Sequence, residues 1–340
     1  PALELSELLA KKTFADKIFF SNSGNEANEA AIKLARRYFY DQGMSEKNEI
    51  IVFTDAFHGR SMMNISAGDS KMQKTGFGPL LKGFKRAKFN DLESVKKIIS
   101  KKTAAIFIEP ILGESGIIRA TNPFLKGLRK IADQHNALLI FDEVITGFGR
   151  VGDSFASKRF KVTPDIMTLA KGITNATIPM GAIGVKSEIY DTIYKKNKDK
   201  IELFHGYTYS GHPIACAAGI ATLEVYEEEK LFERSKSLEK YFGKAAHTLS
   251  KLNVVKDVRN FGLVAGIELA ERQKEPKTLG RDVYEECFNN GLMVRFTGNT
   301  IAISPPLIIT KKQIDKLKLP LMSQINKSRM QTAFTVSIEA

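Results

Sequence analysis

Strand-like apolar stretches alternate with helical patterns through the first two thirds of this 340-residue chain, and this alternation most constrains its fold. The apolar stretches of strand length lie at 17–21, 49–53, 104–108, 137–141, 165–168 and 180–185. Helical patterns lie at 25–40, 91–100, 122–135 and 212–229. This order predicts an α/β fold in which helices cover both faces of a mostly parallel sheet.

The pattern changes after about residue 245. Two alternating stretches flank a turn at Phe261-Gly262, and short helical and strand-like segments follow. These later segments lie at 254–260, 263–269, 281–289, 292–296, 300–304 and about 311–325. We therefore predict a large domain over 1–245, a smaller α+β domain over 246–328, and a tail over 329–340.

The net charge of +13 favours anionic partners, but the lysines are spread thinly along the chain. The densest cluster, at 195–200, contains no aromatic residue on which a base could stack. Nucleic acid is therefore not an expected partner, whereas a small anionic ligand stays open.

Only two cysteines occur, Cys216 and Cys287, which excludes a disulfide scaffold and a cysteine-based zinc cluster. No metal site is expected. No apolar run reaches the roughly 18 residues of a membrane helix, and no signal-peptide pattern is visible at the start. We expect a cytoplasmic protein that does not bind a membrane.

Polar or aromatic residues follow the ends of successive predicted strands. The stretches are 21–26 (SNSGNE), 57–60 (FHGR), 109–114 (EPILGE), 141–143 (FDE) and 169–172 (LAKG). Each one alone is compatible with an ordinary turn. Ligands of open parallel sheets bind beyond the carboxyl ends of the strands, so the recurrence of these stretches indicates a binding site there.

Together these stretches contain the groups that pyridoxal phosphate needs. Gly24 opens a helix whose free N–H groups suit a phosphate. Asp142 follows a buried strand, and Lys171 lies between Ala and Gly on a segment that leaves the sheet. An acid, a phosphate site, an aromatic face and a lysine nucleophile match the binding requirements of this cofactor.

The chain resembles the class III, fold-type I aminotransferases, which depend on pyridoxal phosphate. The resemblance extends over about residues 3–325 and rests on 22–29 (NSGNEANE), 57–60, 141–144 (FDEV) and 169–172. It implies that Lys171 binds the cofactor as a Schiff base and moves the substrate proton. It also implies that Asp142 keeps the pyridine nitrogen protonated.

The same resemblance assigns the remaining cofactor contacts. Phe57 and Val144 would cover the two ring faces, with His58 close by, and Glu109 would support the Schiff base. The phosphate would be bound by Ser23, Gly24 and Asn25, and by Thr208 of a neighbouring subunit. The family therefore implies a homodimer with shared active sites.

The two halves of the chain resemble different subgroups of this family. Up to about residue 170 the sequence is similar to acetylornithine and ornithine aminotransferases, for example at 14–20, 89–92 and 164–169. After Lys171 it is similar to ω-amino acid:pyruvate aminotransferases, at 174–180, 205–209 and 303–307. The family's usual additional N-terminal segment is not present in this sequence.

Two positions depart from the acetylornithine type, which carries Gln where this chain has Ile145 and Arg where it has Ala302. Loss of that guanidinium removes a bidentate clamp for a carboxylate. Arg295 fits the position of a mobile arginine in the ω-amino acid group, and we hypothesise that it binds the substrate carboxylate. Glu114 resembles the gating glutamate of ornithine and 4-aminobutyrate enzymes.

The sequence thus predicts a ping-pong aminotransferase that moves a terminal amino group from an acetylornithine-type donor to 2-oxoglutarate or pyruvate. The alternatives are a β-alanine (ω-amino acid):pyruvate aminotransferase, an aminomutase or decarboxylase of the same fold, and a shortened non-catalytic remnant. A nicotinamide-dependent dehydrogenase would need a G-x-G-x-x-G turn, whereas this phosphate turn has the single glycine Gly24.

Overall fold

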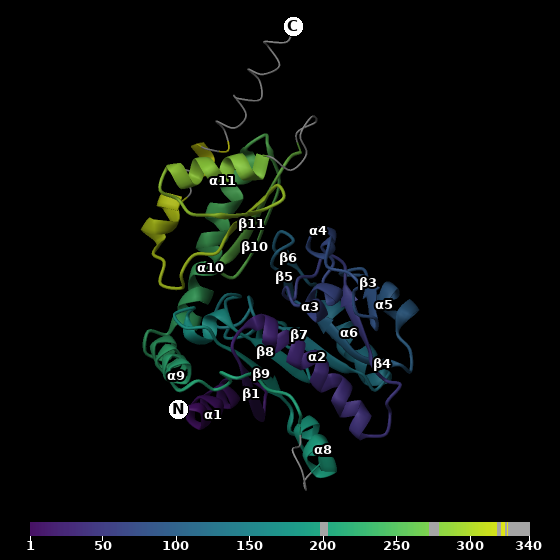
Figure 1. The fold of residues 1–340 in the computed structure, drawn as a ribbon. Helices are drawn as coiled ribbons and strands as arrows, with labels where there is room; N and C mark the ends of the chain where they lie inside the picture. Colours follow the sequence, from purple (N-terminus) through teal and green to yellow (C-terminus); the bar gives the residue numbers. More distant parts are fainter. Residues whose placement is uncertain (198–202, 272–278, 318–320, 324, 326–340) are drawn as a thin grey trace. The chain divides into compact units, whose positions relative to one another are not determined.

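The computed structural model of the chain describes residues 1–197, 203–271, 279–317, 321–323 and 325, which form two compact units (Figure 1). The first unit comprises the described parts of Pro1–Leu112, Ala120–Phe148 and Ser154–Lys230. The second comprises Gly113–Arg119, Gly149–Asp153 and the described part of Leu231–Ala340. The expected division after residue 245 lies inside helix α10 (Leu231–His247) and stays a prediction.

A seven-stranded sheet forms the centre of the first unit. Its order is β1 (Lys17–Ser21), β9 (Gly181–Val185), β8 (Ile166–Leu169), β7 (Leu138–Asp142), β4 (Thr103–Ile108), β2 (Glu49–Phe53) and β3 (Phe84–Ala87). The five strands from β8 to β3 run parallel, whereas β9 pairs antiparallel with both β8 and β1. The mostly parallel α/β sheet is therefore confirmed.

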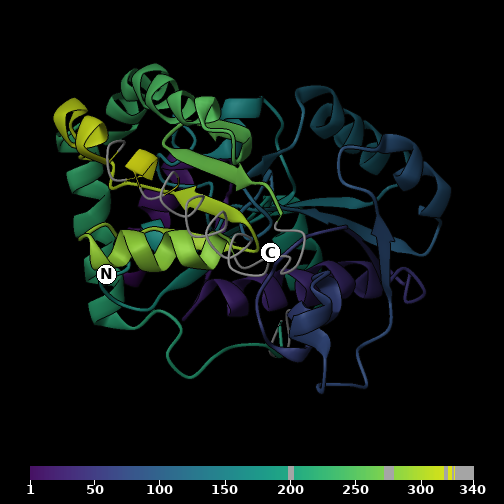
Figure 2. The same cartoon turned by 90° about the horizontal axis from the view of Figure 1, so that it is seen from above.

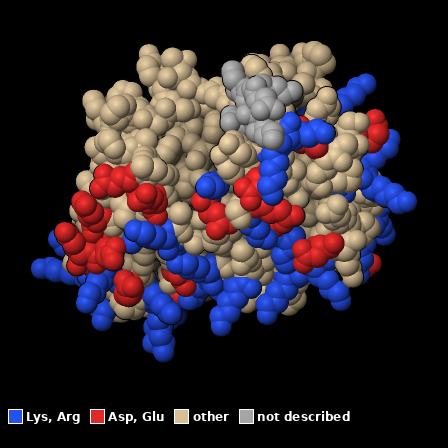
Figure 3. Space-filling model, turned by 90° about the horizontal axis from the view of Figure 1, so that it is seen from below, with Lys and Arg blue, Asp and Glu red and all other residues tan. Residues whose placement is uncertain are grey.

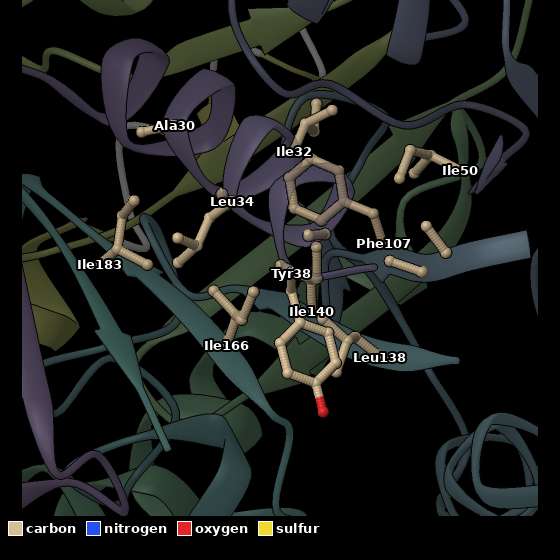
Figure 4. Packing of buried hydrophobic residues seen from close by; sticks show 14 of the residues in the cluster. Ala30, Ile32, Leu34, Tyr38, Ile50, Phe107, Leu138, Ile140, Ile166 and Ile183 are labelled. Atoms are coloured by element: carbon tan, nitrogen blue, oxygen red, sulfur yellow. The ribbon is translucent and has the colours of Figure 1, made fainter. Parts of the chain in front are cut away.

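Helices cover both faces of this sheet. Helix α2 (Gly24–Asp41) packs on one face, where Leu34 and Tyr38 lie with Phe107 and Ile140 in one buried cluster (Figure 4). On the other face, Phe53 of β2 contacts Phe124 with ring centroids 5.6 Å apart. Figure 2 shows α2 and the helices α5 (Leu92–Ile98) and α6 (Asn122–Gln134) on opposite sides of the strands.

Every residue of β4, β7, β8 and β9 is buried, which explains the continuous apolar runs in these segments. Further elements of the first unit lie around the sheet. They are α1 (Ala2–Lys12), α3 (Met62–Ala67), α4 (Lys71–Lys74), β5 (Ile111–Leu112), α7 (Ala156–Phe160), the 3-10 helix η1 (Lys171–Thr174), α8 (Ser187–Asn197) and α9 (Pro213–Glu228).

The second unit is built on an antiparallel sheet with the order β10 (Val255–Phe261), β11 (Val264–Leu269), β13 (Thr300–Ile303) and β12 (Arg295–Thr297). It also contains β6 (Ile118–Arg119), α10, η2 (Thr248–Lys251) and α11 (Leu279–Asn289). The turn between β10 and β11 requires Gly262, whose φ is +59° and whose added Cβ would lie 2.4 Å from the carbonyl oxygen of Arg150.

Some elements differ from the sequence expectations. Strand β3 and helices α8 and α10 are present although no such segments were predicted. Part of the last expected helix, at about 311–325, and the expected tail lie outside the described residues. Within the described part of the chain, no helix combines the length and the apolar character needed to cross a bilayer.

Candidate active site

A cavity of about 510 Å³ lies in the first unit, at the carboxyl ends of its parallel strands. The predicted site residues that line it are Gly24, Asn25, Phe57, His58, Glu109, Asp142, Val144 and Lys171. Asn28, Gly59, Arg60, Ser61, Ile145 and Ala170 complete the lining. Segments that are far apart in sequence therefore meet at one site, as the strand-end pattern indicated.

The start of α2 supplies the candidate phosphate site. Ser23 is the N-cap, and its hydroxyl accepts from the Glu26 N–H at 3.1 Å. The N–H groups of Gly24 and Asn25, in the first turn, have no partner within the helix, so they suit an anion. A Cβ at Gly24 would lie 2.9 Å from the methyl groups of Val144, so only glycine permits this close approach.

The side chain of Asn25 holds the loop at 57–61 against α2. Its Oδ1 accepts from the backbone N–H groups of Arg60 at 2.7 Å and Ser61 at 3.0 Å. Gly59 has a φ of +130°, and an added Cβ there would lie 2.2 Å from this same oxygen. The side-chain oxygen of Asn25 is thus committed to the loop, whereas its backbone N–H, in the first turn of α2, suits an anion.

Among the described residues, Asp142 is, together with Glu109, one of two acids that line the cavity. Its carboxylate is 5% exposed, and Oδ2 accepts from Asn28 Nδ2 at 2.7 Å and from His58 Nδ1 at 2.9 Å. Oδ1 accepts from the Val144 N–H at 3.1 Å. The His58 ring stacks on Phe107 with centroids 3.9 Å apart, which fixes its plane. The carboxylate is therefore oriented by several donors at once.

Lys171 begins η1 directly after β8 and has a φ of +45°, a conformation that costs a non-glycine residue about 1–2 kcal/mol. Contacts of the next residue, Gly172, hold the backbone in this conformation. The carbonyl of Gly172 accepts from the hydroxyl of Tyr226 on α9 at 2.8 Å. A Cβ at Gly172 would lie 2.6 Å from Cβ of Phe148. The turn is thus held in the conformation that directs Lys171 to the cavity.

Glu109 and Glu143 are buried carboxylates with different environments. Glu109 lines the cavity, and its Oε1 accepts from the Phe57 N–H at 2.8 Å. Glu143 accepts from the N–H groups of Ala156 and Ser157 at 2.6 and 2.8 Å. Burial, opposed by these donors, raises the pKa of Glu143. Of the neighbouring acids Asp142 and Glu143, only Asp142 lines the cavity.

Glu114 and Arg295, the predicted substrate residues, belong to the second unit and form an ion pair there. Arg295 on β12 lies directly opposite Ala302 on β13 in the strand register. Thr208 lies exposed in the loop before α9.

Comparison with known proteins decides the family. The family model described as "Aminotransferase class-III" matches residues 1–325. The chain is a class III aminotransferase. An omega-aminotransferase of Caulobacter vibrioides is 44% identical over 89% of this chain and 74% of its own length. An acetylornithine aminotransferase of Clostridium acetobutylicum is 41% identical over 93% of this chain and 78% of its own.

Solved structures agree with this assignment. A transaminase from the marine bacterium Virgibacillus superposes with a TM-score of 0.92 at 31% identity, over 98% of this chain and 80% of its own. The expected family, the fold class and the enzyme class are therefore confirmed, and the dehydrogenase alternative is excluded. Class III aminotransferases depend on pyridoxal phosphate.

In this aminotransferase, sequence reasoning assigned no role to Asn28, Thr168 or Tyr226. Asn28 lies in the quoted stretch 22–29, one helical turn after Gly24, so its position on the cavity side could have been found from the helical period. Thr168 is a polar residue inside a fully buried strand, which is itself an indication of a specific partner. Nothing in the local sequence links Tyr226 to η1.

Proposed function

We propose that this aminotransferase moves the terminal amino group of an ω-amino acid to a keto acid by ping-pong transfer, with pyridoxal phosphate in the cavity of the first unit. The observation that carries the proposal is that the cavity joins Lys171, Asp142 and the first N–H groups of α2. Two relatives, named for omega and acetylornithine substrates, support a donor with a distal amino group.

The residues of the cavity fit the cofactor. The N–H groups of Gly24 and Asn25 would bind its phosphate, with Ser23 as the cap of the same turn. Phe57 and Val144 would hold the ring between them. Glu109 accepts from the backbone N–H of Phe57 and so fixes its position. His58 likewise fixes the carboxylate of Asp142. Asp142 would accept a hydrogen bond from the ring nitrogen.

When bound, pyridoxal phosphate supplies the carbonyl that takes up the amino group and the ring that delocalises negative charge. Lys171 would hold the cofactor through that carbonyl carbon, and its Nζ would be the base that takes the proton from the donor carbon. The other lining residues orient the donor and reduce access of water to this carbon.

Arg295 and Glu114 are proposed to recognise the substrate carboxylate. A guanidinium binds a carboxylate through two parallel hydrogen bonds, and Glu114 holds the guanidinium when no carboxylate is present. The cross-strand position of Arg295 next to Ala302 supports the view that it replaces the arginine absent there.

Two donor classes are supported by different features. The likeness of the first half to acetylornithine enzymes, together with Glu114, favours an acetylornithine-type donor with 2-oxoglutarate. The location of Arg295 within 295–298 (RFTG) favours β-alanine or a similar ω-amino acid with pyruvate.

We also propose a homodimer in which Thr208 of each subunit reaches the phosphate of the other. Phe204, Tyr209 and Ile214 flank Thr208 with exposed fractions of 74%, 67% and 62%, which is unusual for a free surface. In Figure 3, few charged side chains lie in the upper left part of the face that is drawn. Two buried free thiols, Cys216 and Cys287, are consistent with a cytoplasmic location.

The deciding experiment measures amino transfer by the purified protein loaded with pyridoxal phosphate. N-acetylornithine with 2-oxoglutarate and β-alanine with pyruvate are the two donor and acceptor pairs. We expect the visible absorption of the bound cofactor to disappear with the true donor and to return with its keto acid. Failure with both pairs and with other ω-amines would refute the proposed function.

A matched variant tests the lysine. Lys171→Ala is expected to abolish turnover while the protein stays folded. Lys161→Ala makes the same change at another lysine with positive φ, +55°, which does not line the cavity, and is expected to keep full activity. Equal activity of the two variants would show that Lys171 is not the nucleophile.

A further inference from the structure

The Asp142 carboxylate is connected to Asn28, which lines the cavity, and through Asn28 to Thr168, which does not. Asn28 on α2 donates to Asp142 Oδ2 at 2.7 Å, and the same Nδ2 donates to the carbonyl oxygen of His58 at 2.7 Å. Thr168 on β8 lies 2.6 Å from Oδ1 of Asn28. Exposed fractions are 2% for Asn28 and 0% for Thr168, so these groups depend on one another for hydrogen bonds.

The direction of each hydrogen bond follows from the chemistry of the groups. The carboxylate of Asp142 and the carbonyl of His58 only accept, so the NH₂ end of Asn28 must face them. Oδ1 of Asn28 then faces Thr168 and needs a donor, which the Thr168 hydroxyl supplies. The chain of donors therefore runs from Thr168 through Asn28 to Asp142.

The single hydroxyl proton of Thr168 determines which oxygen of the Asp142 carboxylate can accept a further hydrogen bond. Thr168 Oγ1 also lies 3.5 Å from Asp142 Oδ1, but its proton is used in the shorter bond to Asn28. Oδ2 already accepts two hydrogen bonds, from Asn28 and His58. Oδ1 accepts one short bond, from the Val144 N–H at 3.1 Å, and so keeps a lone pair for another donor.

We propose that Thr168 and Asn28 form a relay that positions the Asp142 carboxylate and reserves its Oδ1 for the N–H of the cofactor ring. Both are positioning residues, because they act through Asp142. The inference rests on the proposed function, since it needs a cationic ring nitrogen as the donor to Asp142.

The test uses the protein loaded with ¹⁵N-labelled pyridoxal phosphate, whose ring-nitrogen NMR shift reports protonation. The variants are Thr168→Val, which removes the hydroxyl, and Asn28→Leu, which removes the amide that donates to Asp142 without adding a charge. Each is expected to lower the protonated fraction of the ring nitrogen. Each should also slow proton removal from the donor carbon by at least about tenfold, with KM for the donor nearly unchanged.

Two control variants make the same chemical changes elsewhere in the first unit. Thr103→Val removes a hydroxyl from another threonine that is 0% exposed. Asn197→Leu removes a buried amide that also donates to a carboxylate, Asp41, at 3.1 Å. Neither residue lines the cavity, so both variants should keep the wild-type ring-nitrogen shift. Thr168→Ser retains the hydroxyl and should restore the signal if Thr168→Val folds poorly.

The outcomes separate this inference from the function beneath it. If the wild type transfers amino groups but Thr168→Val and Asn28→Leu retain the protonated ring nitrogen, the relay is refuted and the function stands. If the wild type neither binds the cofactor nor transfers amino groups, the proposed function fails and the relay with it. Loss of protonation in both variants but not in the controls supports the relay.

Discussion

At the scale of single residues, Arg295 is the most direct test of substrate recognition. We expect Arg295→Gln to lower kcat/KM for a carboxylate-bearing donor by about tenfold, or about 1.4 kcal/mol, because a neutral amide cannot replace the guanidinium. A donor amine without a carboxylate should be affected much less. Steady-state kinetics with a matched pair of donors measures the difference.

Arg281 provides the control for this change. Its side chain is 69% exposed against 64% for Arg295, and it forms an ion pair with Glu285 at 2.8 Å. Arg281→Gln therefore removes a similar exposed ion pair and is expected to leave both donors unaffected. An equal loss for both donors in Arg295→Gln would argue against a role in binding the carboxylate.

Glu143 tests the stability of the turn after β7. Its oxygens accept from the hydroxyl of Thr146 at 3.0 Å and from the N–H groups of Ala156 and Ser157. In Glu143→Gln the NH₂ group must face one of these donors. We expect a loss of about 1–3 kcal/mol in the free energy of unfolding, measured by denaturant titration.

The same residue makes a pH prediction. Because burial raises the pKa of Glu143 in the folded protein, the unfolded chain releases this proton at lower pH. Between the two pKa values the folded state binds more protons, so this group's contribution to stability falls as pH rises from the ordinary carboxylate range through the folded pKa. Denaturant titrations over that range should show the decline in the wild type, and its persistence in Glu143→Gln would contradict the assignment to Glu143.

At the scale of elements, the bond from Tyr226 on α9 to η1 is expected to hold Lys171 in place. Tyr226→Phe should lower kcat several-fold and cost about 1 kcal/mol of stability, because one buried hydrogen bond is lost. Tyr38→Phe is the control: Tyr38 is also 7% exposed, and its hydroxyl bonds Glu188 at 3.2 Å, away from the cavity. Its kcat should not change.

Elements with a continuous apolar run or a clear helical period could be predicted from the sequence. The runs at β4 and β7 and the period of α2 produced segments that agree with the structure to within one residue at each end. Edge strand β3 carries Lys85 and Arg86 in only four residues, so it has no strand-like pattern. Helix α10 has apolar residues at helical spacing, so this helix could also have been predicted from the sequence.

The candidate site shows the same limit. The location of Asp142 and Lys171 could be predicted because polar residues recur at the ends of successive strands, and both residues line the cavity. Partners that only three-dimensional packing brings together could not, as for Tyr226, which is 54 residues away from Gly172 along the chain. The pairing of Arg295 with Ala302 across neighbouring strands likewise could not be predicted, because it depends on the register of β12 and β13.

At the scale of the whole molecule, the two units each contain one thiol, which makes their opening separately measurable. Cys216 lies in α9 of the first unit and Cys287 in α11 of the second, and both are 0% exposed. Burial raises the pKa of both, that of Cys287 to about 11. Each thiol is therefore expected to react with an alkylating reagent only when its unit opens.

Single-thiol variants turn this into a test of how the cofactor stabilises the molecule. Cys287→Ala leaves Cys216 as the reporter of the first unit, and Cys216→Ala leaves Cys287 as that of the second. Pyridoxal phosphate at 100 times its Kd should stabilise the unit that binds it by about 2.7 kcal/mol, which slows labelling of Cys216 about 100-fold. Labelling of Cys287 should stay unchanged if the second unit opens independently. Equal protection of both thiols would mean that the units open together, and protection of Cys287 alone would contradict a cofactor site built from the first unit.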